Sequence, residues 1–143
     1  MSKLIKISEF MVDQSDHVIA LWEKCGLTRS WNNLEKYVAR KNSDQNSKFL
    51  IGQIDGVLLA SIKIGYGGHR GSINYLAVDP DHSGASYGKI LMTEAERLLT
   101  LIGCAKINFC VRTDNDKVVE FYHQLGFAIE PVHLLGKRLI EDD

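Results

Sequence analysis

Two glycines, Gly84 and Gly88, stand where the apolar residues change from the spacing of a strand to that of a helix. Residues 75–78 have the pattern of an extended segment, and Asp79-Pro80 ends it. After the loop, apolar residues recur at helical spacing, at Tyr87, Ile90, Leu91, Ala95, Leu98, Leu99 and Ile102. A helix therefore begins inside the loop, and its unpaired first amides and positive dipole end favour a phosphate. The stretch from Tyr75 to Met92 thus predicts a binding site for cofactor phosphates.

Three other loop motifs fit this stretch less well. Gly84-Ala-Ser-Tyr-Gly88 formally matches the GxSxG nucleophile elbow, and Asp114 and His133 follow in the order of a hydrolase. An elbow places its serine directly at the end of a strand, whereas Ser86 comes eight residues after Val78. A P-loop requires four residues between its glycines and finds three here, and a GxGxxG fingerprint is missing.

A second polar cluster lies further along the chain, at Thr113-Asp-Asn-Asp116. Such residues cap helices, and Val118, Phe121, Tyr122 and Leu125 follow at helical spacing. Gly126 is suited to end the helix. A short helix with an apolar face is therefore expected here.

The elements that must position these regions alternate between strands and helices. We expect a strand at 3–7 and two helices, one from about 13–15 to Gly26 and one at 32–40. Asp55-Gly56 is typical of the tight turn of a hairpin, here between strands at 49–54 and 57–66. Further strands are expected at 72–78, 106–111, 127–129 and 134–139, around the long helix and the short one. The order βααβββαβαββ predicts an α/β fold, with a mixed sheet and helices on its faces.

Length and composition predict one soluble domain, residues 1–143. The chain is 45% hydrophobic and 24% charged with a net charge of −1, which gives no general attraction to nucleic acid or to a membrane surface. No apolar run approaches the roughly 18 residues of a membrane helix, and the N-terminus lacks a signal-peptide core, so a cytoplasmic location is expected. Cys25, Cys104 and Cys110 lack metal-ligand spacing, and no metal site is expected.

Taken together, these segments resemble the GNAT superfamily of acetyl-CoA-dependent N-acetyltransferases. The resemblance rests on the strand ending in Leu76-Ala-Val-Asp-Pro80, the glycine-bearing loop with its long helix, and the segment from Asn115 to Phe127. It covers nearly the whole chain. Within the superfamily, the chain is similar to the small bacterial YpeA-type predicted acetyltransferases in four segments, Ala20–Gly26, Trp31-Asn32, Gly68–Gly71 and Leu135–Asp142.

The resemblance implies a GNAT-like acyl-CoA N-acyltransferase fold and direct transfer of an acetyl group from acetyl-CoA to an amine of a small molecule or protein. It implies that the pantetheine arm binds the backbone of Leu76, Ala77 and Val78. The phosphates would bind Ser83, Gly84, Ala85, Ser86, Tyr87, Gly88 and Lys89. Asn115 would contact the pantetheine arm or the pyrophosphate, with a simple helix cap as the alternative.

Tyr122 matches the tyrosine that the family commonly uses as general acid towards the coenzyme A thiolate. A phenol with a pKa near 10 donates to the thiolate of a thiol with a pKa near 8.5 only where the site assists the transfer. The alternative is that Tyr122 is a core aromatic on the face that it shares with Phe121.

The resemblance places Arg29, Trp31 and Asn32 at the acceptor pocket, where Arg29 would pair an acceptor carboxylate or be an ordinary surface residue. Many relatives carry a glutamate base where Ser72-Ile73 stands here. His69, or a water held by the hydroxyl of Tyr75, is then the candidate base, with an exposed loop histidine as the alternative. The acceptor itself is not set by the sequence.

The loop departs from the family pattern at two of its three marker positions, which are Ser83 and Ser86 here instead of Gln or Arg and Gly. A left-handed serine at 86 would cost about 1 to 2 kcal/mol, roughly tenfold in cofactor affinity, and a helical one nothing. Lys89 partly replaces the charge missing at 83. These departures keep a second hypothesis open, a non-catalytic acyl-CoA-binding or regulatory module, and a homodimer is compatible with either.

Overall fold

The protein is described by a computed structural model, which covers residues 4–27 and 47–140. The chain divides into two compact units, with the boundary between Asn108 and Phe109. The first contains the sheet with its two long helices, and the second contains one helix and the segments around it. The mixed α/β class predicted from the sequence is confirmed. That the whole chain forms one domain stays a prediction.

The sheet of the first unit is antiparallel and has four strands in the order β1-β2-β3-β4. The strands are β1 (Lys6–Glu9), β2 (Ser47–Ile54), β3 (Val57–Tyr66) and β4 (Gly71–Val78). Asp55 and Gly56 both have positive φ between the paired residues Ile54 and Val57. This is the two-residue hairpin turn that the dipeptide predicts.

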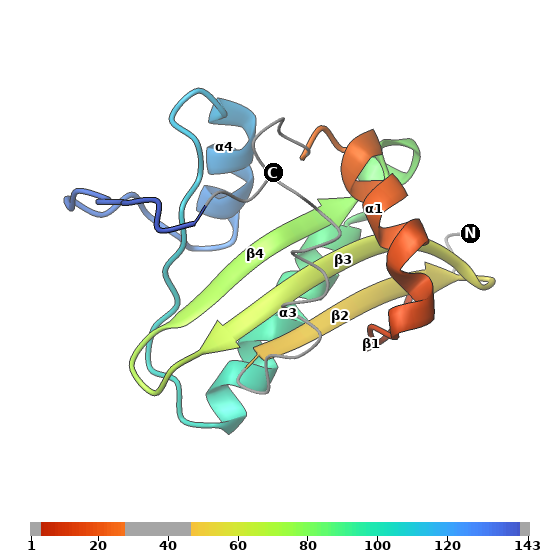
Figure 1. The fold of residues 1–143 in the computed structure, drawn as a ribbon, viewed down its shortest axis with the longest axis horizontal. Coiled ribbons are helices and arrows are strands. Elements are labelled where there is room, and N and C mark those ends of the chain that lie inside the picture. The colour runs from red at the N-terminus through yellow and green to blue at the C-terminus, as the bar shows by residue number, and fades with distance from the viewer. Residues whose placement is uncertain (1–3, 28–46, 141–143) are drawn as a thin grey trace. The chain divides into compact units, whose positions relative to one another are not determined.

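Helices cover both faces of this sheet, as Figure 1 shows: α1 (Ser15–Lys24) lies on one face and α3 (Tyr87–Leu101) on the other. Short 3-10 helices, η1 (Val12–Gln14) and η2 (Pro80–Ala85), precede them. On the α1 face, buried residues of the helix, of the sheet and of the chain beside them form one core cluster, made by Phe10, Val18, Leu21, Trp22, Phe49, Ile51 and Ala77. On α3, the buried residues are Tyr87, Leu91, Met92, Ala95 and Leu99, which keep the helical spacing read from the sequence.

The strand expected at 106–111 is wrong apart from a single residue. Ile107 forms an isolated parallel bridge with Gly71, whose amide donates to the Lys106 carbonyl (2.9 Å) and whose carbonyl accepts from Asn108 (3.0 Å). The first unit therefore holds the start of a fifth strand beside β4, and the pairing does not continue into a ladder.

The second unit contains α4 (Asp116–Gln124), which confirms the short helix. The strands expected at 127–129 and 134–139 are wrong for the residues described, which have no regular structure there. A strand is defined by a hydrogen-bonded neighbour, and an alternating pattern supplies none by itself. The helix expected at 32–40 lies outside the described residues.

Candidate functional site

Strand β4 contains a β-bulge at Tyr75. Ser61 pairs with Ala77 and Lys63 with Asn74, so two residues of β4 stand opposite one residue of β3. Tyr75 has a φ of 50°, a left-handed conformation that few non-glycine residues adopt. A bulge bends its strand and offsets the register beyond it by one residue.

A chain of two hydrogen bonds fixes the bulge from the α1 side. The indole Nε1–H of Trp22 donates to Ser61 Oγ (2.9 Å), and the Ser61 hydroxyl donates to the Tyr75 carbonyl (2.8 Å). The rings of Trp22 and Tyr75 are stacked with centroids 4.1 Å apart. Trp22 and Ser61 are both completely buried. Sequence reasoning missed this arrangement, for which the sequence signal is a serine at 61 among the apolar residues 57–62.

The register of β4 decides which backbone groups reach the open edge of the sheet. The Asp79 amide donates to the Leu59 carbonyl (2.7 Å), so this pair and the Ser61–Ala77 pair bond inwards to β3. The amides and carbonyls of Leu76 and Val78 therefore point away from β3, and the Val78 carbonyl accepts a hydrogen bond from the Cys25 thiol beyond the end of α1 (3.3 Å). Of the three residues predicted to bind pantetheine, Leu76 and Val78 are half-buried at this edge and Ala77 is buried in the core, and their role towards pantetheine stays a prediction.

The loop after β4 is more ordered than the glycines suggest. The Asp79 carboxylate accepts from the Asp81 amide (2.9 Å) and so caps η2, and Lys24 bridges Asp79 (2.9 Å) and Asp81 (2.8 Å). Burial opposes ionisation of Asp79, but the Asp81 amide and the Lys24 ammonium outweigh it and hold the pKa of Asp79 below its usual value. The hydrogen bonds to Asp81 and Asp79 in turn raise the pKa of Lys24. The end of α1 is thereby fastened to the start of the loop.

The loop ends at Ser86 in a left-handed conformation, with φ 62° and ψ 24°. Among the described side chains none caps α3 at this residue, and binding of a phosphate at the helix start stays a prediction. Tyr87 is buried, and the next residues, Gly88 and Lys89, are progressively more exposed. For Ser83, Gly84 and Ala85, the structure describes the backbone of η2 and not the side chains.

In the second unit, Tyr122 is the buried centre of an aromatic cluster. Its ring packs edge-on against Phe109, Phe121 and Phe127, with centroids 4.5, 5.1 and 5.7 Å away. Burial raises the pKa of Tyr122 to about 12. Asn115 caps α4, since its side chain accepts from the Val118 amide (3.4 Å). The structural interpretation of each residue therefore holds, and their roles towards the cofactor stay predictions.

Of the residues predicted for the acceptor, the structure describes His69 and Tyr75. Arg29, Trp31 and Asn32 lie outside the described residues. His69 is exposed in the loop between β3 and β4, and its carbonyl accepts from the Arg70 guanidinium (3.4 Å). Tyr75 is half-buried against Trp22. Its hydroxyl remains a candidate for holding a water.

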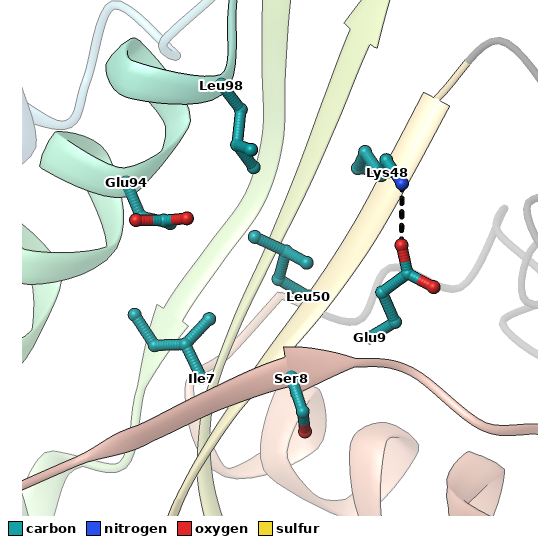
Figure 2. Close-up of a pocket in the computed structure, with 7 residues that line it drawn as sticks. All are labelled: Ile7, Ser8, Glu9, Lys48, Leu50, Glu94 and Leu98. Carbon is teal, nitrogen blue, oxygen red and sulfur yellow. Dashed lines mark hydrogen bonds and ion pairs between the residues drawn. The ribbon is translucent and has the colours of Figure 1, made fainter.

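The first unit also contains two cavities. Figure 2 shows one of about 330 Å³ on the α3 side of β1, where Ile7, Leu50 and Leu98 are flanked by Glu94 and the Lys48–Glu9 ion pair (2.6 Å). None of the predicted site residues lines it. The other, about 530 Å³, lies between α1 and the β2–β3 hairpin. Among the described residues, no cluster of metal-ligand side chains occurs, and no helix has the length and apolar character to cross a membrane.

Comparison with known proteins identifies relatives over almost the whole chain. Residues 15–127 match the profile of the Acetyltransferase (GNAT) family. An acetyltransferase of Yersinia pestis (strain Pestoides F) is 40% identical over 138 residues, which are 96% of this chain and 98% of the relative.

Solved structures share the fold at low sequence identity. The PaiA N-acetyltransferase from Thermoplasma acidophilum, in complex with coenzyme A, aligns with a TM-score of 0.77 at 19% identity, covering 92% of this chain and 94% of that one. AAC(6')-Iy, in complex with a bisubstrate analogue of coenzyme A and monomethyl-acetylneamine, aligns with a TM-score of 0.78 at 16% identity, covering 96% and 100%.

Proposed function

The chain belongs to the GNAT family of acetyltransferases and is an acyl-CoA-dependent transferase, and we propose that it moves an acetyl group from acetyl-CoA directly to the amine of a small molecule or protein. The observation that carries the proposal is the bulged edge of β4, which runs into a loop and the uncapped start of α3. The proposal includes the cytoplasmic location expected from the sequence.

The edge of β4 and the start of α3 provide complementary groups for the donor. A pantetheine arm contains amides, and the amides of Leu76 and Val78 and the Leu76 carbonyl are proposed as their donors and acceptor, since the Val78 carbonyl already accepts from Cys25. A pyrophosphate is an anion, and the first amides of α3 together with Lys89 favour it. Because these groups belong to one continuous stretch of the first unit, their arrangement does not depend on the second unit.

Bound acetyl-CoA supplies an activated thioester, whose carbonyl carbon the neutral amine attacks. A C–N bond forms, the C–S bond breaks, and the amine loses one proton while the thiolate gains one. Backbone amides at the β4 edge are suited to polarise the carbonyl. We assign the proton for the thiolate to Tyr122, and we keep Asn115 as a contact of the pantetheine arm or the pyrophosphate.

The raised pKa of Tyr122 limits how this proton moves. At about 12 the phenol stays protonated throughout the neutral range and is always able to donate a hydrogen bond. Full transfer to a thiolate whose thiol has a pKa near 8.5 is uphill by about 3.5 units, roughly 5 kcal/mol. Tyr122 is therefore proposed to hydrogen-bond the departing sulfur and to take a replacement proton from water as it donates its own, so that no phenolate accumulates.

The acceptor side rests on fewer observations. His69 or a water on Tyr75 is proposed to take the proton of the amine, and Arg29, Trp31 and Asn32 stay proposed as the lining of the acceptor pocket. One structural neighbour, AAC(6')-Iy, is in complex with a bisubstrate analogue that contains monomethyl-acetylneamine. Small amines and protein amino groups are both proposed as acceptors. A homodimer is compatible with either class of acceptor.

The test is a thiol-release screen on the purified chain with acetyl-CoA and four acceptor classes: polyamines, amino acids, aminoglycosides and peptide N-termini. We expect acetyl-CoA to be consumed with one class and not with the others. Calorimetry with coenzyme A is run beside it. Binding without turnover on any amine favours the non-catalytic module, for which the serines at 83 and 86 are the reason, and absence of both binding and turnover refutes both functions.

A further inference from the structure

The positive φ of Tyr75 needs support from outside its own strand. A bulky residue in the left-handed region is strained and persists only where its surroundings hold it. Tyr75 is also the residue that makes the bulge. The surroundings that keep it in place therefore set the register of the rest of β4.

The support is a relay of groups that have few alternatives. Trp22 is completely buried, so its indole N–H requires an acceptor, and Ser61 Oγ is that acceptor at 2.9 Å. A serine hydroxyl has one proton, and here it is directed to the Tyr75 carbonyl at 2.8 Å. The stacked ring of Trp22 restrains the Tyr75 side chain at the same time. Both ends of the bulge residue, its carbonyl and its ring, are thus held from α1 and β3.

The bulge determines which backbone groups reach the edge of the sheet. With it, Leu76 and Val78 direct their amides and carbonyls outwards and Ala77 bonds to Ser61. Without it, the register beyond residue 74 would shift by one, and a shift of one reverses the direction of every following residue. Leu76 and Val78 would then bond to β3, and Ala77 would leave the cluster on the α1 face.

We propose that Ser61 and Trp22 are positioning residues for acyl-CoA binding: the relay from Trp22 through Ser61 holds the Tyr75 carbonyl, and so keeps the backbone of Leu76 and Val78 on the cofactor edge. Neither side chain touches the cofactor in this scheme. The inference rests on the proposed function for its cofactor, while the hold on the bulge is a property of the free protein.

The first experiment measures coenzyme A affinity by calorimetry in variants with matched effects on the core. Ser61→Ala removes both hydrogen bonds, Ser61→Thr keeps the hydroxyl, and Trp22→Phe removes the indole donor together with part of the buried ring. Ile51→Val is the control, since Ile51 is as completely buried as Ser61 and Trp22, belongs to the same core cluster as Trp22, and lies outside the relay. We expect Ser61→Ala to weaken binding about tenfold and Ser61→Thr to restore most of the affinity. Trp22→Phe should fall between them.

Thermal unfolding separates positioning from a general loss of stability. If Ser61→Ala weakens binding no more than Ile51→Val at a similar melting temperature, Ser61 is only a core residue and the inference is wrong. Failure of Ser61→Thr to restore binding, although the protein melts like the wild type, would equally overturn it.

The second experiment reads the bulge without any cofactor. In amide NMR spectra of the free protein, Ser61→Ala should displace or broaden the signals of residues 74–76 more than Ile51→Val does. Tyr75→Gly adopts positive φ at little cost, so in that background Ser61→Ala should disturb these signals much less. Unchanged signals in the Ser61→Ala single variant would overturn the hold on the bulge. Wild-type protein that binds no coenzyme A would refute the proposed function, and the spectra would still decide whether Ser61 holds Tyr75.

Discussion

The cofactor edge in the first unit and the aromatic cluster around Tyr122 in the second contribute to the proposed reaction in different ways. At the edge of β4, the useful groups are backbone amides and carbonyls, and their direction is set by a bulge and by hydrogen bonds from Ser61. In the second unit, the useful group is one side chain, Tyr122, and its burial among aromatic rings sets its acidity.

This difference decides how each region responds to mutation. A backbone group cannot be deleted by changing its own side chain, so the edge is altered only through residues that hold its conformation, such as Ser61 or Ser86. A phenol is removed in one step, with its ring left in place. The largest effect is therefore expected from the side chain and smaller ones from the supports of the backbone.

Tyr122→Phe should lower kcat about 10²- to 10⁴-fold, the range that positioned proton donors contribute. The ring stays, so packing against Phe109 and Phe127 and the affinity for acetyl-CoA should change little. Steady-state turnover on the acceptor found in the screen, with calorimetry for the donor, measures both. Tyr66→Phe, on β3, is the control for loss of a phenol. Full turnover by Tyr122→Phe would show that the thiolate takes its proton from elsewhere.

The free energy of unfolding should fall at alkaline pH because of the same residue. The folded-state pKa of Tyr122 is raised from 10 to about 12, so its contribution is complete below pH 10 and is lost as pH rises towards 12. Two units correspond to at most about 2.7 kcal/mol. Denaturant titrations from pH 9 upwards should show this loss, and it should be absent in Tyr122→Phe. A loss of equal size in the variant would mean that Tyr122 titrates like an exposed tyrosine.

The sequence predicts best the features that depend on neighbours in the chain. The hairpin turn at Asp55-Gly56 and the buried face of α3 follow from local residue types and from helical spacing, and both are confirmed. The family is confirmed as well. Its motifs also consist of residues that are close together in the chain. The strands expected after residue 103 depend on pairing with distant residues, and only Ile107 finds a partner, Gly71.

The fine geometry of the candidate site also depends on residues that are distant in the chain. The left-handed backbone of Tyr75 is held by contacts with Ser61 and Trp22, which are 14 and 53 residues earlier in the chain. No local pattern at Tyr75 predicts this conformation. The residue type of Tyr122 is plain in the sequence, whereas its raised pKa results from folding the aromatic rings around it. Residue types and the family were thus predictable from motifs, the residue roles stay predictions, and the conformations of these residues were not predictable.

The left-handed backbone at Ser86 revises the cost expected from the sequence. We predict that the free protein already has this conformation, with φ 62° and ψ 24°, so that the strain opposes folding and not the binding of the cofactor. Ser86→Gly should therefore stabilise the protein by about 1 kcal/mol and leave coenzyme A affinity unchanged. Ser86→Ala is the control, since alanine bears the same strain. If Ser86→Gly tightens binding tenfold instead, the loop reaches its left-handed form only with the cofactor.

The smallest effect is expected where α1 is fastened to the loop by Lys24. The pKa of Asp79 lies below its usual value, so its contribution to stability is present above the ordinary aspartate range and is lost as pH falls through the lower, folded-state value. Because the ion pairs of Lys24 are partly exposed, salt should weaken them. Lys24→Met should lower the melting temperature only slightly at neutral pH and low salt, and the difference from the wild type should shrink in strong salt and in acid.

Asp79→Asn should cost more than Lys24→Met, since the carboxylate also accepts from the Asp81 amide and an amide oxygen accepts less strongly. If the two variants are equal, the cap on η2 contributes nothing and the ammonium alone holds the loop to α1.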